Sequence, residues 1–417
     1  MSDIHFPLTG NSVILAVVIL IHVFFAFLAV GGVVMALLSE WMGKRKNDPD
    51  HARFYAGLSS FLSDMMKING VLGVVILVLL IGLWKTFTGF LYSTLFWLFV
   101  AEGAFFLLLM VFSVSWRRTR DRISSGAHLL LGAGVAFCAV MTAFLINAAW
   151  AFMMAPGKWL ETGSRWDAVQ SPVLWESFTH MLLPCLINAA LLIFLYNLWK
   201  SRAPGPDAAY FEKIGRFHAR VAAALIFLQP LSGIGFLLKV RSVSQGLPVP
   251  NPFQQLWTGL GRPFLHVMIT LAVISVLCAA LYWILGHKKG KKALVVAAVA
   301  MFTAFFVGGY AREKARKPYL VWGSMYMSQQ WKTAETPPAP KSGAPNGPSV
   351  YANSGCGACH SFLGQGGTMG PELADLAESF SKDDLKAFLS EPPEDMPPFF
   401  GSEEELDVLA TYILTNS

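Results

Sequence analysis

Residues 356–360 read Cys356-Gly357-Ala358-Cys359-His360, and this motif constrains the remainder of the chain. Two cysteines separated by two residues and followed directly by histidine are the signature of covalent c-type haem attachment. The two thiols add to the vinyl groups of the haem, and His360 is expected to bind its iron. The sequence has no second C-x-x-C, which a zinc site of four thiolates would need. Because haem is attached outside the cytoplasmic membrane, this part of the chain is expected there.

The chain around the motif is too apolar for a soluble protein. Of its 417 residues, 54% are hydrophobic and only 14% are charged, which is typical of a protein with several membrane spans. The net charge of +6 does not indicate nucleic acid as a partner, because the positive residues fall in short loops between apolar runs. The other three cysteines lie inside apolar runs, so no disulfide framework is expected.

Eight apolar runs are long enough to cross a bilayer, which takes about 20 residues. They lie near residues 12–40, 66–86, 91–115, 127–153, 172–199, 217–239, 263–286 and 293–311. The predicted fold class is therefore all-α. A polytopic transmembrane bundle of eight spans is expected in residues 1–320, a Pro-rich linker in residues 321–348, and a small helical domain with the haem motif in residues 349–417.

The loops between the runs alternate in charge. One set of loops is rich in basic residues: Lys44, Arg45, Lys46, Arg53, Arg117, Arg118, Arg120, Arg122, Lys200, Arg202, Lys213, Arg216, Lys288, Lys289, Lys291 and Lys292. The other set holds only Lys85, Lys158, Arg165, Lys239, Arg241 and Arg262. Basic loops stay in the cytoplasm, so the N-terminus is expected on the periplasmic side of a bacterial inner membrane. An even number of crossings returns the chain to that side, where the haem motif also has to lie.

Residues 349–417 resemble a class I cytochrome c. Gly370-Pro371-Glu372-Leu373 resembles the G-P-x-L turn of that family, and Met396-Pro397-Pro398-Phe399 resembles its axial methionine loop. Met396 is the expected second iron ligand, and Met369 is the alternative, although a loop methionine packed against the ring is its more typical role. With histidine and methionine on the two sides of the iron, this haem should carry electrons rather than bind substrate.

Several side chains at membrane depth are candidates for further haem ligands, because ionisable residues inside a bilayer are costly and default to functional roles. All of them fall at mid-depth or towards the side of the haem motif: His22, Glu102, His180, His266, Met268 and Glu313. Such a one-sided set of His, Met and Glu favours haem over hydrogen-bonded packing residues. His128 and His218 lie near the cytoplasmic ends instead, where their side chains are expected to extend to the interface.

Over residues 10–320 the chain resembles subunit I of the cytochrome bd quinol oxidases. The similar segments are Ile21-His22-Val23-Phe24-Phe25, Ile68-Asn69-Gly70-Val71-Leu72-Gly73-Val74, Ala101-Glu102-Gly103-Ala104-Phe105-Phe106, Leu145-Ile146-Asn147-Ala148-Ala149-Trp150 and Arg312-Glu313-Lys314-Ala315-Arg316-Lys317-Pro318-Tyr319. The resemblance implies that His22 binds the oxygen-reducing haem and that Glu102 faces its iron. It further implies His180 as a ligand of the low-spin haem b, with Met268 or His266 opposite. Glu313 corresponds to the ligand of the high-spin haem b, and Arg316 to the arginine of that signature.

The resemblance implies one covalent haem c, two haems b, and either haem d or a third haem b. It also implies a second polytopic subunit like subunit II of these oxidases, with cytochrome c and quinol as candidate electron partners. The sequence departs from the family at three places. Met110 replaces the second acidic residue of the third helix, residues 240–262 are too short for the quinol-binding loop, and the linker and haem domain replace the ninth span.

Two functions follow from these observations. The first is a bd-type oxidoreductase that reduces oxygen at the His22/Glu102 haem. The second is an electron-transfer module without oxygen chemistry, either a quinol:cytochrome c oxidoreductase or a membrane anchor that links another enzyme to the quinone pool. A transporter or channel that uses the intramembrane carboxylates is a third reading, but it gives the haem motif no role.

Overall fold

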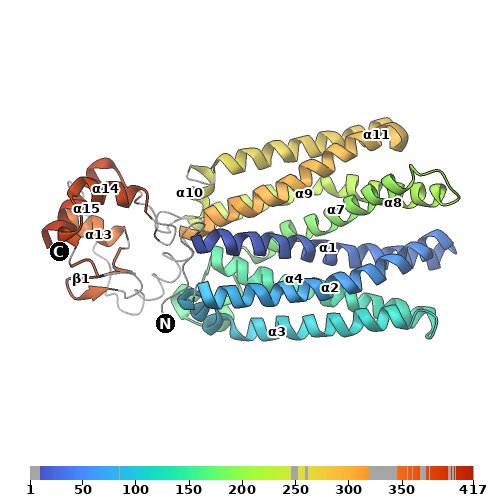
Figure 1. Ribbon diagram of the computed structural model, residues 1–417, viewed down its shortest axis with the longest axis horizontal. Helices are drawn as coiled ribbons and strands as arrows, with labels where there is room; N and C mark the ends of the chain where they lie inside the picture. Colours follow the sequence, from blue (N-terminus) through green and yellow to red (C-terminus); the bar gives the residue numbers. More distant parts are fainter. Residues whose placement is uncertain are drawn as a thin grey trace.

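The computed structural model describes residues 10–83, 85–245, 252–258, 262–318, 345–354, 356–358, 360–366, 372–374, 376–392, 396, 399 and 401–416. Long helices form a bundle, and a small domain follows at the C-terminus (Figure 1). The bundle contains α1 (Gly10–Lys46), α2 (Pro49–Leu83), α3 (Lys85–Arg118), α4 (Ser125–Met154), α5 (Trp159–Thr162), α6 (Arg165–Ala168), α7 (Leu174–Lys200), α8 (Ala208–Ile226), α9 (Leu228–Ser244), α10 (Pro252–Trp257) and α11 (Arg262–Pro318).

The described helices cross the bundle eight times. Seven helical segments are long and apolar enough to span a membrane, and α8 and α9 together make one of them. The last segment, within α11, reverses direction at Gly286, whose φ of 67° lies in the left-handed region that favours glycine (Figure 1). Its two arms pack against each other, because a Cβ added at Gly290 would lie 2.7 Å from the Cα of Tyr282. The predicted all-α bundle of eight spans is therefore confirmed.

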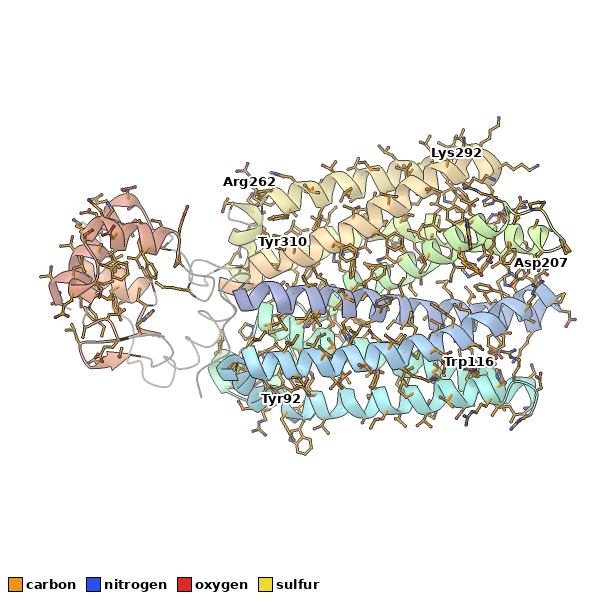
Figure 2. All side chains as sticks on the ribbon, viewed as in Figure 1. Tyr92, Trp116, Asp207, Arg262, Lys292 and Tyr310 are labelled. Atoms are coloured by element: carbon orange, nitrogen blue, oxygen red, sulfur yellow. The ribbon has the colours of Figure 1, made fainter. Side chains whose placement is uncertain are left out.

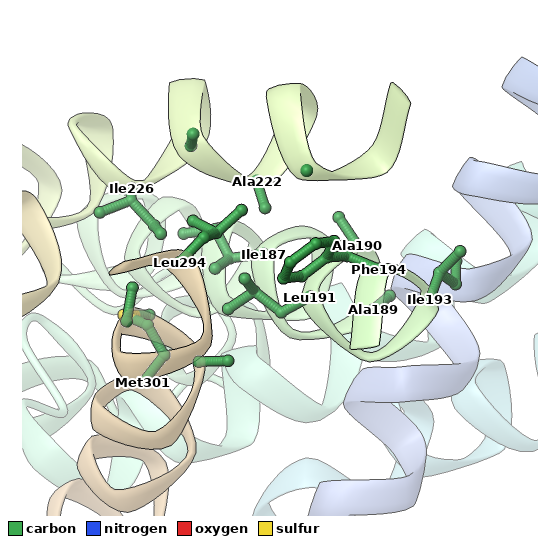
Figure 3. Packing of buried hydrophobic residues seen from close by; sticks show 14 of the residues in the cluster. Ile187, Ala189, Ala190, Leu191, Ile193, Phe194, Ala222, Ile226, Leu294 and Met301 are labelled. Atoms are coloured by element: carbon green, nitrogen blue, oxygen red, sulfur yellow. The ribbon is translucent and has the colours of Figure 1, made fainter. Parts of the chain in front are cut away.

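Small residues allow close packing in the centre of the bundle. A core cluster joins α7, α8 and the second arm of α11, where alanines alternate with larger side chains: Ile187, Ala190, Leu191, Phe194, Ala222, Ile226, Leu294 and Met301 (Figure 3). A Cβ at Gly31 of α1 would lie 1.9 Å from the carbonyl oxygen of Cys185 on α7. Helix backbones in a membrane approach closely through such small residues, so α1 and α7 can meet only with glycine at this position.

The two ends of the bundle differ in charge. The end where α1 stops carries Lys44, Arg45 and Lys46, and the α11 turn with its lysines lies at the same end. We call this the basic end. The opposite end, where α2 stops and α10 lies, is called the α10 end. Figure 2 shows Lys292 and Asp207 at the basic end, and Arg262 and Tyr310 at the α10 end.

The C-terminal domain contains α13 (Gly347–Asn353), η2 (Cys356–Ala358), β1 (Ser361–Phe362), β2 (Gln365–Gly366), η3 (Leu376–Glu378), α14 (Lys382–Ser390) and α15 (Glu403–Asn416). The two strands pair antiparallel. Helix α14 begins at its cap Ser381, whose hydroxyl accepts a hydrogen bond from the Asp384 amide. The helices enclose a core of Val350, Leu385, Leu389, Leu406, Leu409, Ala410 and Ile413. The helical domain expected around the haem motif is thus present, with a short hairpin in addition.

Candidate functional site

His22 lies on α1 with its ring against one segment of α2. The side chain is half-buried, and none of the described residues hydrogen-bonds its buried Nδ1 atom. The ring lies beside the backbone of Asn69, and a Cβ at Gly73 would lie 3.4 Å from its Cε1 atom. Both residues belong to the Ile68–Val74 segment singled out in the sequence. An imidazole nitrogen that is buried and unpaired in this way is available to bind a metal.

Glu102 lies on α3 at the same depth as His22. Gly70 of α2 faces Phe106 of α3, since a Cβ at Gly70 would lie 3.0 Å from the Phe106 ring. Helices α2 and α3 run antiparallel, so a step of about one turn from this contact towards the α10 end reaches Gly73 on α2 and Glu102 on α3. Glu102 is half-buried. His22 and Glu102 therefore lie at the same depth in the bundle.

His180 is held by two polar residues of α9. Its Nδ1 lies 3.1 Å from Ser232 Oγ and 3.1 Å from the amide nitrogen of Gln229, and its ring stacks on Phe236. The Oε1 atom of Gln229 is buried without a partner among the described residues. A half-turn of the Gln229 amide would place Oε1 against Nδ1–H of His180. In that orientation Nδ1–H donates to Gln229, and the Nε2 lone pair of His180 is free for iron.

Met268 and His266 point in different directions. The methyl of Met268 would lie 3.1 Å from a Cβ at Gly308, so this half-buried side chain faces the second arm of α11. His266 is exposed and lines a shallow pocket with Trp257 of α10. Residues two apart on a helix point to nearly opposite faces. The geometry therefore separates the two candidate ligands and gives Met268 the position inside the bundle.

Three candidate ligands share one packing feature, which tests whether a haem fits them. Each faces a glycine, and a Cβ added to that glycine would lie only 3.1 to 3.4 Å from the ligand side chain: His22 with Gly73, His180 with Gly233 and Met268 with Gly308. Glycine leaves the facing helix without a side chain, so a flat ring bound by the ligand can approach the backbone. The three facing glycines and the unpaired Nδ1 of His22 therefore fit the binding of haem by these residues.

In the C-terminal domain, Cys356 lies in η2 and His360 follows it closely. The His360 side chain is buried, and its backbone N–H donates to the Cys356 carbonyl over 3.1 Å. Met396 is half-buried and packs against the helical core. Cys359 and the alternative ligand Met369 lie outside the described residues, as do the side chains of Glu313 and Arg316 on the last turns of α11.

A buried cluster at the basic end was not expected from the sequence. Glu40 and His128 are each 2% exposed, and Oε1 of Glu40 lies 2.6 Å from Nδ1 of His128. The Trp116 indole donates to Glu40 Oε2 over 3.0 Å, and the Tyr55 hydroxyl lies 3.1 Å from His128 Nε2. We call these four residues the Glu40–His128 cluster. Glu40 ends the first apolar run, and this acid was the signal in the sequence.

The expectation that His128 and His218 extend to the membrane interface is wrong. His128 belongs to the cluster, and His218 is fully buried, with its Nδ1 3.0 Å from the Ile214 carbonyl. Tyr55 of α2 and Trp116 of α3 cover the His128 ring, so the imidazole finds its partners inside the bundle.

Comparisons with known proteins agree with this architecture. Residues 13–240, more than half of the chain, match the family "Cytochrome bd terminal oxidase subunit I". Residues 343–413 match "Cytochrome C oxidase, cbb3-type, subunit III". No curated protein matches the sequence significantly.

Among solved structures, the bd oxidase from Geobacillus thermodenitrificans is similar in fold, with a TM-score of 0.64 at 20% sequence identity, over 76% of this chain and 89% of that one. The bundle, its candidate haem ligands and the family match lead to one conclusion. The chain belongs to the cytochrome bd terminal oxidase subunit I family, a family of haem-containing membrane oxidoreductases of electron transport, and carries a cytochrome c domain at its C-terminal end.

Proposed function

We propose that this protein is a bd-type oxidase subunit that moves electrons between quinol or cytochrome c and its membrane haems and reduces oxygen at a haem bound by His22. The observation that carries the proposal is the unpaired Nδ1 of His22, buried between α1 and α2 at the depth of Glu102. An imidazole ligand at the same depth as a carboxylic acid is suited to a haem that takes up protons together with electrons.

The remaining residues have distinct roles in this proposal. Haem iron, when bound, supplies one-electron transfer and, at an open position, oxygen binding. His180 and Met268 hold a low-spin haem b, and Gln229 with Ser232 fixes the orientation of the His180 ring. Glu313 and Arg316 hold the third membrane haem, whether its partner at His22 is haem d or haem b. Cys356, Cys359, His360 and Met396 hold haem c.

The protein is oriented by its charge. The basic end faces the cytoplasm, so the α10 end, the N-terminus and the cytochrome c domain lie on the periplasmic side of a bacterial inner membrane. Outward apolar side chains on α2, among them Ile68, Val71 and Val78, are exposed. They suit lipid or a second polytopic subunit like subunit II. In this proposal residues 1–320 form the membrane unit, and residues 321–348 link it to the haem domain.

The alternative is electron transfer without oxygen chemistry, as in a quinol:cytochrome c oxidoreductase or a quinone-linked anchor. One observation favours it: Met110, at the place of the second acid of α3, packs in an apolar cluster with Leu109 and Trp116. A proton route along α3 would have no carboxylate there.

Carbon monoxide binding separates the two functions. If the proposal is right, the reduced complex binds CO at a high-spin haem and consumes oxygen, and His22→Ala abolishes both while His266→Ala leaves both unchanged. If every membrane haem is six-coordinate, the reduced complex shows no CO shift and the electron-transfer alternative is correct.

A further inference from the structure

We propose that protons enter the protein through the Glu40–His128 cluster and reach the His22/Glu102 site along one face of α2. The inference rests on the proposed function, because oxygen reduction is what consumes the protons. It assigns a role to a buried acid and imidazole that no ligand set uses. The route has three parts: the entrance, a stripe of polar residues and the end at Glu102.

The entrance is a titratable pair one side chain away from solvent. Lys44 contacts the Glu40 carboxylate and donates to the Ser125 carbonyl over 2.7 Å, and its side chain is 32% exposed. Arg120 lies over the ring of Tyr55 at 5.1 Å. Glu40 and His128 themselves are buried, so a proton taken up past Lys44 at the basic end passes directly into the bundle.

The stripe begins at Tyr55 and runs along α2. It continues through Ser59, Ser63 and Asn69, at intervals that keep all four residues on one face of the helix. Each is at most 8% exposed. The exposed face of α2 carries apolar side chains such as Ile68 and Val71 and also the exposed ion pair of Asp64 with Lys67. The stripe is therefore distinguished by the burial of its polar groups.

Two groups on the stripe have no hydrogen-bond partner in the described part of the chain: Ser63 Oγ and Asn69 Oδ1. Ser39 Oγ on α1, fully buried beside Glu40, is in the same state. Most buried polar side-chain atoms in folded proteins have a hydrogen-bond partner, either another protein group or an ordered water. A purely structural role, in which the Glu40–His128 cluster holds helices α1 to α4 together, would explain the hydrogen bonds of Glu40 and His128. It would not explain why Ser63 Oγ and Asn69 Oδ1, deeper in the bundle, are unpaired. In the proposed route, water molecules along the stripe would satisfy them.

The spacing suits a chain of such waters. With a rise of about 1.5 Å per residue, Tyr55, Ser59 and Ser63 follow each other at about 6 Å, and Asn69 lies about 9 Å beyond Ser63. Gaps of this size are bridged by one or two waters. The contact of Gly70 with Phe106 also sets Ser113 of α3, 4% exposed, at the level of Ser63.

The stripe ends at the proposed oxygen site. Asn69 adjoins the His22 ring, and Gly73, one turn further, faces that ring at the depth of Glu102. The reaction is O2 + 4 electrons + 4 protons → 2 H2O, with the electrons arriving through the haems. Each proton moves from bulk water to the Glu40–His128 pair, then through hydroxyls that donate one proton as they accept another, to the Glu102 carboxylate. This route replaces the acid that α3 lacks at Met110.

Substitution of Ser63 tests the route with two side chains of the same shape. Ser63→Val removes the hydroxyl, and Ser63→Thr keeps it. Ser60, half-buried and turned away from the stripe, supplies the control pair Ser60→Val and Ser60→Thr. Oxygen consumption, proton uptake by the reduced complex reported by a pH dye, and the CO spectrum are measured for each.

We expect Ser63→Val to slow oxygen consumption and proton uptake by about tenfold or more, with an unchanged CO spectrum, and Ser63→Thr to stay near the wild type. Glu40→Gln is expected to have the same effect as Ser63→Val, and both Ser60 variants to have none. Equal rates for Ser63→Val and Ser63→Thr would overturn the route while the proposed function stands. A wild-type complex that neither binds CO nor consumes oxygen would overturn both.

Discussion

At the scale of single residues, three of the proposed membrane ligands, His22, His180 and Met268, each face a glycine. A Cβ at Gly233 would lie 3.1 Å from Cε1 of His180, which is closer than ordinary van der Waals contact. A methyl group there displaces the imidazole ring, because packed side chains have little room to move. Gly235, two residues further along α9, has no such neighbour within 4 Å.

Gly233→Ala is therefore expected to reduce the low-spin haem b bound at His180, whereas Gly235→Ala retains it. Both substitutions stabilise the helix by about 1 kcal/mol through the higher helix propensity of alanine. A difference in haem content between the two variants therefore reports the contact with His180 alone. Reduced-minus-oxidised spectra of the purified complexes measure the haem. If the two variants had the same haem content, His180 would not be a haem ligand in the position that it occupies against Gly233.

At the scale of elements, short connections fix how the helices meet at the basic end. Asp48, between α1 and α2, accepts a hydrogen bond from Lys213 of α8 over 2.8 Å, and Asp50 accepts another from the same amine. The hydrogen bond from Lys213 holds the pKa of Asp48 below its usual range. Asp207, at the start of α8, pairs with Arg53 of α2. Ion pairs thus join α8 to the α1–α2 turn.

The lowered pKa gives the Asp48–Lys213 pair a defined pH dependence. A carboxyl with a lowered pKa in the folded state stabilises the protein above its ordinary pKa, and this contribution is lost as the pH falls through the lowered value. We expect Lys213→Met to reduce stability by about 1 kcal/mol or less at pH 7, as for other ion pairs near the surface. Thermal unfolding of the wild type and of Lys213→Met is expected to show a difference in stability at pH 7 that disappears in acid. A difference of the same size at every pH would exclude this origin.

At the scale of the whole molecule, the sequence was sufficient for the fold but not for all of the site. Apolar runs of bilayer length predict the number of crossings, because lipid requires every span to satisfy its own backbone. They do not predict that the span at residues 217–239 is divided into α8 and α9, or that the helix continues from residue 262 to 318 with a non-helical residue only at Gly286. These depend on local backbone geometry and on packing between helices.

The candidate site could be proposed from the sequence where residue type limits the choice, and not where contacts between helices determine it. His22, His180 and Glu102 stood out as costly residues inside the membrane. The choice between Met268 and His266 needed the facing glycine on the return arm of α11. The Glu40–His128 cluster needed four helices to meet, and no periodicity in one segment reveals such a meeting.

The two proposed haem-binding parts of the chain are expected to bind their haems independently. His360→Ala removes the iron ligand of haem c and leaves the membrane ligands untouched. The variant is expected to lose the c-type spectrum and to keep the haems of the bundle. If it lost every haem, the cytochrome c domain would be required for assembly of the bundle, against the proposed division of the chain.

The central claim is that iron porphyrins lie within the helical bundle as well as in the C-terminal domain. A pyridine haemochrome assay of the purified complex counts and types the haems, and it does so without any assumption about activity. We expect one covalent c-type haem and three non-covalent haems for each chain. A complex that contains haem c alone would contradict it.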